Sequence, residues 1–265
     1  MRAMKTIGCF ITGTDTGVGK TLVTAGLAAA LMERHGKRVH LWKPVQTGVR
    51  PGDADADSAR LQRGSGSPQP AETIATYTLD EPLAPWMAAE RAGVKLRFDR
   101  LLDEGRRRMA EADILLAEGA GGLLVPITDR ETMLDLAAAI GLPLIVVARA
   151  GLGTVNHTLL TVSQARHRCV PVAGVILNGY ERGAEREVRE NARMIEHFGR
   201  VRVLGMLPRM PVSPGTDDFC RDDREKFCPD RTDAGDASDR MPGDPDWREW
   251  RKVVAERVEY DSIFL

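Results

Sequence analysis

The feature that most constrains the fold is a glycine-rich segment near the start of the chain, Phe-Ile-Thr-Gly-Thr-Asp-Thr-Gly-Val-Gly-Lys-Thr-Leu at residues 10–22. Alternating strand-forming residues at 6–12 predict a strand before it. Apolar side chains at helical spacing over residues 22–35 predict a helix after it, with Gly36 as the C-cap. A strand, a glycine-rich turn and a helix in this order place backbone N–H groups around phosphate oxygens. The segment therefore predicts a phosphate-binding turn.

The turn follows the nucleotide-binding pattern G-x-x-x-x-G-K-[ST] with one departure. Thr14 stands at the position of the first glycine, and Gly13 lies one residue earlier. In this pattern Lys20 binds the β- and γ-phosphates and the Thr21 hydroxyl binds Mg²⁺. The alternative, an ordinary Gly/Thr turn between a strand and a helix, is weaker because both flanking patterns are those that the motif requires. We expect a nucleoside triphosphate and Mg²⁺ at this turn.

Composition limits the possible classes of protein. A chain of 265 residues with 43% apolar content is long enough for one large core. The 37 basic and 38 acidic side chains give a net charge of −1, which argues against nucleic-acid binding. The sequence has no run of ~18 apolar residues and no signal-peptide pattern. The four cysteines lack metal or redox spacing and are expected to be free thiols. We expect a cytoplasmic protein that binds neither nucleic acid nor a membrane.

Apolar runs and helical patterns alternate along the chain. Continuous apolar runs predict strands, and apolar residues at helical spacing predict helices between them. Such strands indicate a mostly parallel sheet that helices cover on both faces, an α/β fold. The further strands are expected at residues 38–42, 114–117, 144–148, 172–177 and 201–204, and the helices at 98–112, 131–140, 154–167 and 184–198. Residues 48–57 are rich in Gly, Pro and Asp and predict a surface loop.

Several residues with useful chemistry follow predicted strands. Lys43 follows the second strand, Glu118 follows the strand that ends at Ala117, and Asn178 follows the strand that ends at Leu177. Parallel sheets bind ligands beyond the carboxyl ends of their strands. We therefore expect these side chains to gather around the phosphate-binding turn.

The composition changes from Pro211 onward, where Asp, Arg, Pro and Gly become frequent. We divide the chain into a main domain, residues 1–210, and a polar C-terminal extension, residues 211–265. Residues 214–246 contain too few apolar side chains to offset the entropy of ordering them and are expected to be partly disordered. The spacing of Trp247, Trp250 and Val254 predicts a terminal helix that can dock on the main domain. Every motif precedes the extension, so we expect it to be dispensable for chemistry.

Four blocks, in this order, resemble the dethiobiotin synthetase family. They are GTDTGVGKT at 13–21, KPVQTG at 43–48, EGAGG at 118–122 and GLGTVNH at 151–157. The resemblance runs from about Thr6 to Pro208 and leaves out the C-terminal segment. It implies the P-loop NTPase fold and an ATP-dependent cyclo-ligase of biotin biosynthesis. Members convert 7,8-diaminononanoate and CO₂ to dethiobiotin, ADP and phosphate through a carbamate and a carbamic-phosphoric anhydride.

The resemblance also implies the catalytic and nucleotide-binding residues. Lys20 is expected to hold the β- and γ-phosphates, and Lys43 to bind the carbamate and the transferring phosphoryl oxygens. Two lysines at one phosphate site suit a reaction between two anions. The alternative for Lys43 is a surface lysine at a strand end. The nucleotide-binding residues are expected to be Gly17, Val18, Gly19, Lys20, Thr21, Leu22, Asp57, Glu118, Gly119, Ala120, Gly121, Asn178, Leu207 and Pro208.

Thr21, Asp57 and Glu118 correspond to the family's Mg²⁺ ligands, one hydroxyl and two carboxylates, and Mg²⁺ prefers such oxygen ligands. Asp53 and Asp55 lie beside Asp57 in the same predicted loop, and the alignment through residues 61–63 selects Asp57. Glu118 directly follows a buried strand, where a carboxylate is costly without a partner.

The resemblance implies that Thr47 and Gly121 contact the diamine. It also implies a homodimer in which Gly153, Thr154 and Asn156 of the opposite subunit bind the substrate's tail carboxylate at a helix N-terminus. Taken alone, Asn156 is interpreted as a helix cap. Gly17 departs from members that carry an acidic side chain at its position.

Three alternatives remain open. An ATPase switch of the partitioning and septum-positioning type shares the fold, but it needs a second lysine early in the loop, where this chain has Asp15. An amidotransferase-type synthetase needs a glutaminase domain with a reactive cysteine, for which the segment after Pro211 is too short and polar. An inactive relative is disfavoured because both lysines and all three metal-ligand candidates are present.

Overall fold

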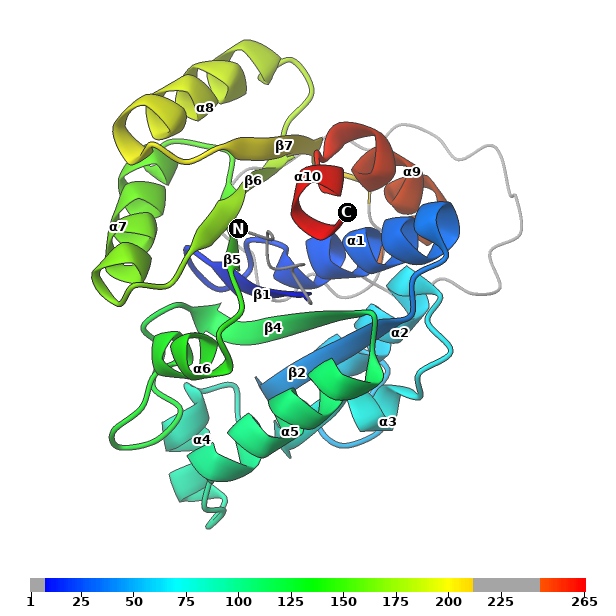
Figure 1. Cartoon of the computed structure of the whole chain (residues 1–265), viewed down its shortest axis with the longest axis vertical. Helices are drawn as coiled ribbons and strands as arrows, with labels where there is room; N and C mark the ends of the chain where they lie inside the picture. Colours follow the sequence, from blue (N-terminus) through cyan, green and yellow to red (C-terminus); the bar gives the residue numbers. More distant parts are fainter. Residues whose placement is uncertain (1–7, 212–243) are drawn as a thin grey trace, which may run out of the picture.

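The protein is built around a seven-stranded sheet whose neighbouring strands are all parallel (Figure 1). The computed structural model describes residues 8–211 and 244–265. The strand order is β3-β2-β4-β1-β5-β6-β7. The strands are β1 (Gly8–Gly13), β2 (Val39–Thr47), β3 (Ala75–Leu79), β4 (Ile114–Gly122), β5 (Leu144–Arg149), β6 (Val172–Tyr180) and β7 (Val203–Pro208). The predicted α/β class is confirmed.

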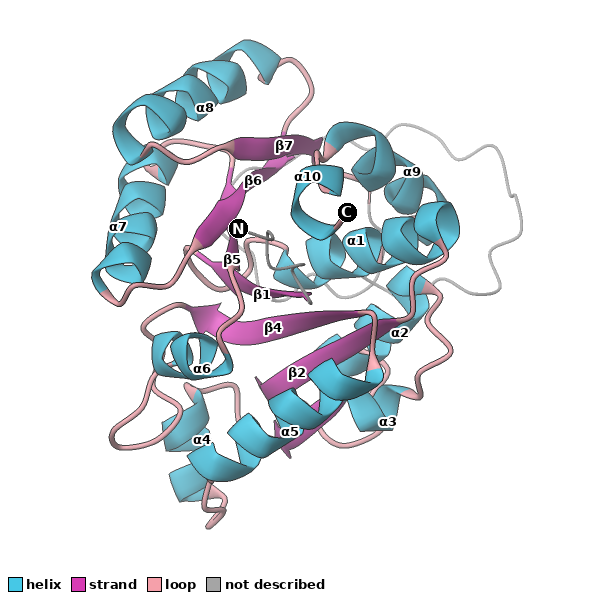
Figure 2. Ribbon diagram, viewed as in Figure 1, coloured by secondary structure: helices cyan, strands magenta, loops and turns pink. Residues whose placement is uncertain are grey.

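Helices cover both faces of this sheet (Figure 2). Those of the first half are α1 (Lys20–His35), α2 (Asp57–Ser65), α3 (Ala71–Ile74), α4 (Pro85–Arg91) and α5 (Phe98–Glu111). Those of the second half are α6 (Met133–Ile140), α7 (Thr154–His167), α8 (Glu185–Gly199), α9 (Trp247–Arg257) and α10 (Asp261–Phe264).

Side chains alternate between the two faces along each strand, and both faces are buried. In β1, Cys9 and Ile11 enter the core shared with α1 and α9, whereas Phe10 enters the core shared with α5 and α6. A strand buried on both sides needs apolar residues at every position, which explains the continuous apolar runs.

The chain changes direction across the sheet at β1, which lies between β4 and β5. It passes from β1 to β2 and β3 on one side, returns to β4, and then continues to β5, β6 and β7 on the other side. Open parallel sheets bind ligands at such a reversal, beyond the carboxyl ends of the strands. The glycine-rich turn directly follows β1 and therefore occupies this position.

The structure corrects the predicted ends of several strands. β2 continues to Thr47 and β4 continues to Gly122, so Lys43 and Glu118 lie within strands and not after them. β6 extends through Asn178 to Tyr180, and β7 covers Val203–Pro208 where 201–204 was predicted. The predictions for β2, β4 and β6 stopped at the first polar residue, because an apolar criterion does not recognise polar side chains that are buried with partners.

Pro44 lies inside β2, although proline cannot donate a hydrogen bond to a sheet. The last pair between β2 and β4 is Trp42 with Ala117, and from Lys43 onward β2 pairs only with β3. Beyond Trp42 the strand therefore behaves as an edge, where proline is tolerated.

Among the described residues, five short elements were not predicted. They are β3, α2, α3, α4 and α10, which cover 5, 9, 4, 7 and 4 residues. β3 is an edge strand whose side chains are mostly half-buried. The predicted surface loop at 48–57 ends where α2 begins, at Asp57. Short elements with few buried apolar residues leave little periodic pattern in the sequence.

The predicted terminal helix is confirmed as α9, which packs along α1 (Figure 1). Trp250 and Val254 are fully buried, and Val254 lies against Gly26 so closely that an added Cβ there would sit 2.5 Å from it. α9 therefore completes the core on this face, while the expectation that the extension is dispensable for chemistry stays a prediction. Most of residues 214–246, with Cys220 and Cys228, lie outside the described residues.

Cys9 and Cys169, the cysteines among the described residues, are free thiols. Among the helices of residues 8–211 and 244–265, none combines the length and apolar character needed to cross a bilayer.

Candidate active site

The glycine-rich turn wraps from the end of β1 to the start of α1. Gly17 and Gly19 have φ values of 68° and 88°, a left-handed conformation that glycine adopts without strain. Gly19 precedes the first helical residue, Lys20, so the N-terminus of α1 faces the turn. Lys20 folds back over it and donates from Nζ to the Asp15 carbonyl at 3.1 Å. This geometry is that of a phosphate-binding loop.

A group of four side chains lies beside this loop, and we call it the lysine–carboxylate cluster. Its members are Thr21, Lys43, Asp57 and Glu118. Lys43 Nζ lies 2.6 Å from Asp57 Oδ2 and 2.7 Å from Glu118 Oε1. Thr21 Oγ1 lies 3.0 Å from Asp57 Oδ1 and 2.9 Å from Glu118 Oε1. The structure thus brings together the lysine and the three metal-ligand candidates that the sequence analysis selected.

Burial makes the charges of this cluster interdependent. The side chains of Lys43 and Glu118 are 2% and 0% exposed, while that of Asp57 is 36% exposed. Burial alone would lower the pKa of Lys43, but the attraction of Asp57 and Glu118 outweighs it and raises that pKa above its ordinary value. Burial would likewise raise the pKa of Asp57, but the Lys43 charge and hydrogen bond keep it below its usual range. Lys43 is therefore not the surface lysine of the alternative interpretation.

In the described part of the chain, Lys20 has no such carboxylate contact. Burial, followed by repulsion from Lys43, lowers the pKa of Lys20 to about 8. Two ammonium groups at one partly enclosed site favour an anion between them, since each would be stabilised by the added negative charge. Phosphate oxygens would supply that charge.

The point where strands part creates the space for this cluster. Trp42 and Ala117 are the last paired residues of β2 and β4, and the next residue in each strand is a cluster member, Lys43 and Glu118. Glu118 is also the register partner of Ile11 in β1, just before the glycine-rich turn. The separation of β2 from β4 lets both side chains reach toward Thr21.

Gln46 fixes the start of α2, where Asp57 lies. Its Oε1 accepts from the Ser58 backbone N–H at 3.1 Å, and its Nε2 lies 3.2 Å from Ser58 Oγ and 2.9 Å from Thr78 Oγ1. The Gln46 side chain is buried. No role was predicted for Gln46 from the sequence. The only indication was its place inside the KPVQTG block, which leaves its partners undefined.

The oxygen atoms of the cluster suit a Mg²⁺ ion. Glu118 Oε2 is buried and has no hydrogen-bond partner among the described residues, so one carboxylate oxygen is left for a ligand. No group of three His, Cys, Asp or Glu side chains in residues 8–211 and 244–265 is arranged to hold a metal ion. Mg²⁺ bound beside phosphates usually takes only one or two carboxylates, with the other ligands from water and phosphate. The set of Thr21, Asp57 and Glu118 fits that use.

Three of the expected nucleotide-binding residues, Asn178, Leu207 and Pro208, lie on β6 and β7. Asn178 in β6 is the register partner of Leu207 in β7, and Pro208 pairs with Tyr180. Asn178 Nδ2 donates to the Val18 carbonyl of the glycine-rich turn at 2.9 Å. Asn178 therefore holds the turn itself, a contact that the sequence analysis did not foresee.

The EGAGG block, residues 118–122, forms the end of β4 beside the glycine-rich loop. Lys43 Nζ lies 3.4 Å from the Gly119 carbonyl, and an added Cβ on Gly121 would lie 3.5 Å from the Thr16 side chain. Gly121 has a φ of 64°, so a side chain there would be both crowded and strained. Ala120 between them is buried. The crowding at Gly121 comes from Val125, whose Cγ2 would lie 2.9 Å from such a Cβ, and at Gly119 from the Phe10 ring, also at 2.9 Å.

Unlike the cluster residues, the residues expected to bind the substrate do not lie together. Thr47 lies half-buried at the end of β2. Gly153 and Thr154 form the start of α7, and Asn156 is exposed in its first turn. The cap position belongs to Gly153, so Asn156 is not the helix cap of the alternative interpretation. Within the described residues, no hydrogen bond or ion pair joins these α7 residues to the lysine–carboxylate cluster.

Arg149 at the end of β5 is a further charged residue at this edge that sequence reasoning missed. Its Nη2 lies 2.9 Å from Asp15 Oδ2, and both side chains are about half exposed. Asp15 occupies the position where an ATPase switch would carry its second lysine. A carboxylate paired with arginine here gives the loop a different charge pattern from that alternative.

Together, the parallel sheet with its reversal at β1, the glycine-rich loop and the charged cluster define the class of P-loop nucleotide-binding α/β proteins. A family model described as an AAA domain matches residues 8–215. An ATP-dependent dethiobiotin synthetase from Bacillus cereus (strain B4264) is 45% identical over 201 residues, covering 76% of this chain and 83% of that protein. A protein of the same name from Bacillus thuringiensis (strain Al Hakam) is 44% identical over the same shares. The chain belongs to the ATP-dependent dethiobiotin synthetase family, a family of ligases.

Two solved structures are similar at lower levels. The MinC:MinD cell division protein complex of Aquifex aeolicus has a TM-score of 0.46 at 14% identity, covering 77% of this chain and 82% of that one. A ParA family ATPase from Chlorobium tepidum TLS has a TM-score of 0.48 at 13% identity, covering 76% and 84%. Likeness at this level carries no conclusion about function.

Proposed function

We propose that this protein is a dethiobiotin synthetase that closes the cyclic urea of dethiobiotin from 7,8-diaminononanoate, CO₂ and ATP. Membership of the family supports the overall reaction. The observation that carries the proposal is Lys43, a buried ammonium placed between two carboxylates and next to the phosphate-binding loop. An ATPase that only hydrolyses nucleotide has no need of a second buried cation for an anionic acceptor.

The chemistry requires two anions to meet. One amine of the substrate adds to CO₂ and loses a proton, which forms a carbamate. A carbamate oxygen then attacks the γ-phosphorus, and the bond from that phosphorus to ADP breaks. The second amine attacks the carbonyl carbon of the resulting anhydride, phosphate leaves, and the amine loses its proton. The first attack is opposed by charge repulsion between carbamate and ATP, so cations must offset it.

The residues of the cluster suit these roles. Lys20 and the loop N–H groups bind the β- and γ-phosphates, and Lys43 offers positive charge to the carbamate and to the transferring phosphoryl group. Thr21, Asp57 and Glu118 would hold Mg²⁺, which when bound neutralises phosphate oxygens as a Lewis acid. Asp57 and Glu118 also hold Lys43 in place. Asn178, Leu207 and Pro208 are proposed to contact the base, and Thr47 and Gly121 the diamine.

We also propose a homodimer in which α7 of one subunit completes the substrate site of the other. Leu152 is fully exposed just before α7, and Leu124, after β4, is 54% exposed. Both follow carboxyl ends of strands, so they lie at the same edge of the sheet as the nucleotide loop. The Thr154 hydroxyl is buried without a hydrogen-bond partner in the described part of the chain. A helix N-terminus with free N–H groups suits the substrate's carboxylate.

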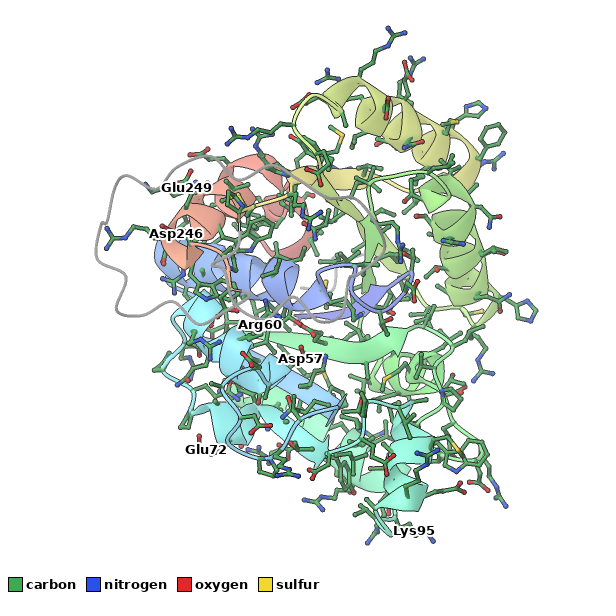
Figure 3. All side chains as sticks on the ribbon, turned by 180° about the vertical axis from the view of Figure 1, so that it is seen from behind. Asp57, Arg60, Glu72, Lys95, Asp246 and Glu249 are labelled. Carbon is green, nitrogen blue, oxygen red and sulfur yellow. The ribbon has the colours of Figure 1, made fainter. Side chains whose placement is uncertain are left out.

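The test is a reaction of the purified protein with ATP, Mg²⁺, bicarbonate and 7,8-diaminononanoate, with dethiobiotin followed by mass spectrometry. Dethiobiotin is expected with the native protein and with the Lys95→Ala control, whose side chain is exposed at the far end of the molecule (Figure 3). Lys43→Ala should form it about 10²–10³-fold more slowly. A folded protein that binds ATP but makes no dethiobiotin would overturn the proposal.

A further inference from the structure

We propose that the C-terminal segment formed by Asp244 and α9 is a positioning element for Asp57, through the helix α2 that begins with that residue. The inference deepens the proposed Mg²⁺ site and so rests on the proposed function. The matched family model ends at residue 215, so the segment belongs to this chain's own sequence beyond that match. Figure 3 shows Asp57 and Arg60 on α2, with Asp246 just before the neighbouring α9 and Glu249 in its first turn.

Asp244 is a buried carboxylate that binds α2 through two arginines. Its side chain is 2% exposed. Arg60 Nε lies 2.7 Å from Asp244 Oδ1, and Arg63 Nη2 lies 2.7 Å from Oδ2. Trp247 Nε1 donates to the same Oδ2 at 3.0 Å. The charge-assisted bonds to the arginines fix the angle of α2 more strongly than neutral ones would.

A second set of contacts holds the far end of α2. Arg251 donates from Nε to the Gly64 carbonyl at 2.7 Å and from Nη2 to the Arg63 carbonyl at 2.9 Å. The Trp247 ring lies on Gly64, where an added Cβ would sit 2.4 Å from a ring carbon. These bonds satisfy carbonyls of the last helical turn, which have no partner within the helix. The C-terminal segment therefore holds α2 from Arg60 to Gly64.

α2 needs this support because little within it is stabilising. A helix of nine residues is marginal by itself. In the described structure, its N-cap residue Ala56 makes no side-chain cap bond. The loop before Asp57 depends on the same contacts, because Arg63 also donates from Nη1 to the Ala54 carbonyl at 2.7 Å. A shift of α2 would move Asp57 away from Thr21 and Lys43.

Contacts from two directions fix the position of α2 and therefore of Asp57. Gln46 in β2 holds Ser58, and Asp244 holds Arg60 and Arg63. Residues that orient metal ligands through hydrogen bonds typically change metal affinity by about 10–100-fold when they are mutated. The alternative is that Asp244 and α9 only stabilise the fold. That alternative predicts a lower melting temperature with no change in metal affinity in the folded protein.

The experiment measures Mg²⁺ binding by calorimetry, with the full chain saturated with a non-hydrolysable ATP analogue, alongside the KM for Mg²⁺ in turnover. Asp244→Asn keeps the shape of the side chain and removes its charge. It is expected to weaken Mg²⁺ binding by about tenfold and to raise the KM for Mg²⁺, with a smaller change in kcat at saturating Mg²⁺. Thermal unfolding of each variant identifies the temperature range in which it is folded.

Val258→Ala is the matched control, because Val258 is buried at the end of α9 against Gly205 of β7 and not against α2. It should lower the melting temperature and leave Mg²⁺ affinity unchanged. Equal losses of Mg²⁺ affinity in Val258→Ala and Asp244→Asn would overturn the inference. If Asp244→Asn does not fold, Trp247→Phe replaces it as the test variant. Trp247→Phe removes one hydrogen-bond donor to Asp244 and keeps an aromatic ring on Gly64. That variant should weaken Mg²⁺ binding in the same direction, and unchanged binding would overturn the inference.

Asp57→Asn separates this inference from the proposed function. If Asp57→Asn does not weaken Mg²⁺ binding, the proposed metal site itself fails. If it does and Asp244→Asn binds Mg²⁺ as the native protein does, only the positioning role of the C-terminal segment fails.

Discussion

The lysine–carboxylate cluster and the loop at residues 151–156 occupy the same edge of the sheet, yet they are built in opposite ways. In the cluster, Lys43 and Glu118 are buried and contact each other at 2.7 Å. In the loop, Leu152 is fully exposed, and the buried Thr154 hydroxyl has no partner in the part of the chain that the structure describes.

This difference indicates how much of a binding site one chain supplies. The cluster gathers side chains from β2, β4 and the starts of α1 and α2, whose charges pair with one another and leave Glu118 Oε2 for a ligand. The loop presents a helix N-terminus and an apolar side chain that a single chain leaves uncovered. We therefore expect substitutions in the cluster to change chemistry and folding, and substitutions in the loop to change association.

The largest expected effect is that of Lys43→Ala. Removal of a charged group that stabilises the transferring phosphoryl should lower kcat by about 10²–10³-fold. It also leaves Asp57 and Glu118 without their cation, which should cost about 3–5 kcal/mol of unfolding free energy without Mg²⁺. Added Mg²⁺ should recover part of that loss, as measured by chemical denaturation with and without the metal. Lys95→Ala should change neither quantity, and unchanged stability of Lys43→Ala without Mg²⁺ would contradict the described cluster.

Trp250→Ala tests whether the core behind the cluster depends on α9. Trp250 is 1% exposed, and its Nε1 donates to the Leu22 carbonyl at 2.7 Å. Loss of a buried tryptophan typically costs about 3–5 kcal/mol, which we expect in the free energy of unfolding. Trp250→Phe should cost less, because it keeps most of the buried surface. A truncation after Pro211 should be at least as destabilising as Trp250→Ala, and a stably folded truncated protein would show that α9 is dispensable for the core.

Gln46→Ala should have an intermediate effect. It leaves the Ser58 N–H and the Thr78 hydroxyl without their partner, which should lower the free energy of unfolding by about 1–3 kcal/mol. Because Gln46 holds the start of α2, the KM for Mg²⁺ should also rise. Gln69→Ala is a useful comparison, since Gln69 holds the Leu41 backbone and not α2. If the two variants raised the KM for Mg²⁺ equally, the specific role of Gln46 would be lost.

Leu152→Ser should have the smallest effect on the chain itself. Substitution of an exposed residue that makes no buried contact usually changes the free energy of unfolding by less than about 0.5 kcal/mol. If the loop lies in a dimer interface, the variant should still weaken association, which sedimentation equilibrium measures. Phe198→Ser is the control, because Phe198 is 69% exposed near the end of α8, at the opposite edge of the sheet. Unchanged association in Leu152→Ser would argue against an interface at this loop.

Local patterns were enough to predict the central fold and the nucleotide loop. The glycine-rich turn, the strand before it and α1 depend on residues that are neighbours in sequence, so their pattern is visible without a structure. The same holds for the continuous apolar strands β4, β5 and β6. The family resemblance supplied the site residues, of which Thr21, Lys43, Asp57 and Glu118 do lie together.

The elements that escaped prediction share a physical cause. β3 and α2 are short and only partly apolar, so they exist because of what they pack on. The extension of β2 through Lys43 and Pro44 depends on its change of partner from β4 to β3. Strand pairing joins segments that are distant in sequence, so it cannot be predicted from a local sequence pattern.

The sequence by itself determined that this chain forms a parallel α/β sheet with a phosphate-binding loop, because alternation, helical spacing and glycine positions are local properties. Only the tertiary structure decided which charges meet. Thr21 and Glu118 lie 97 positions apart, and Arg60 and Asp244 lie 184 positions apart, yet each pair is in hydrogen-bond contact. Such contacts depend on the packing of whole helices and strands, so the partners of Lys43, the role of Gln46 and the support of α2 by the C-terminal segment became visible only in the folded chain.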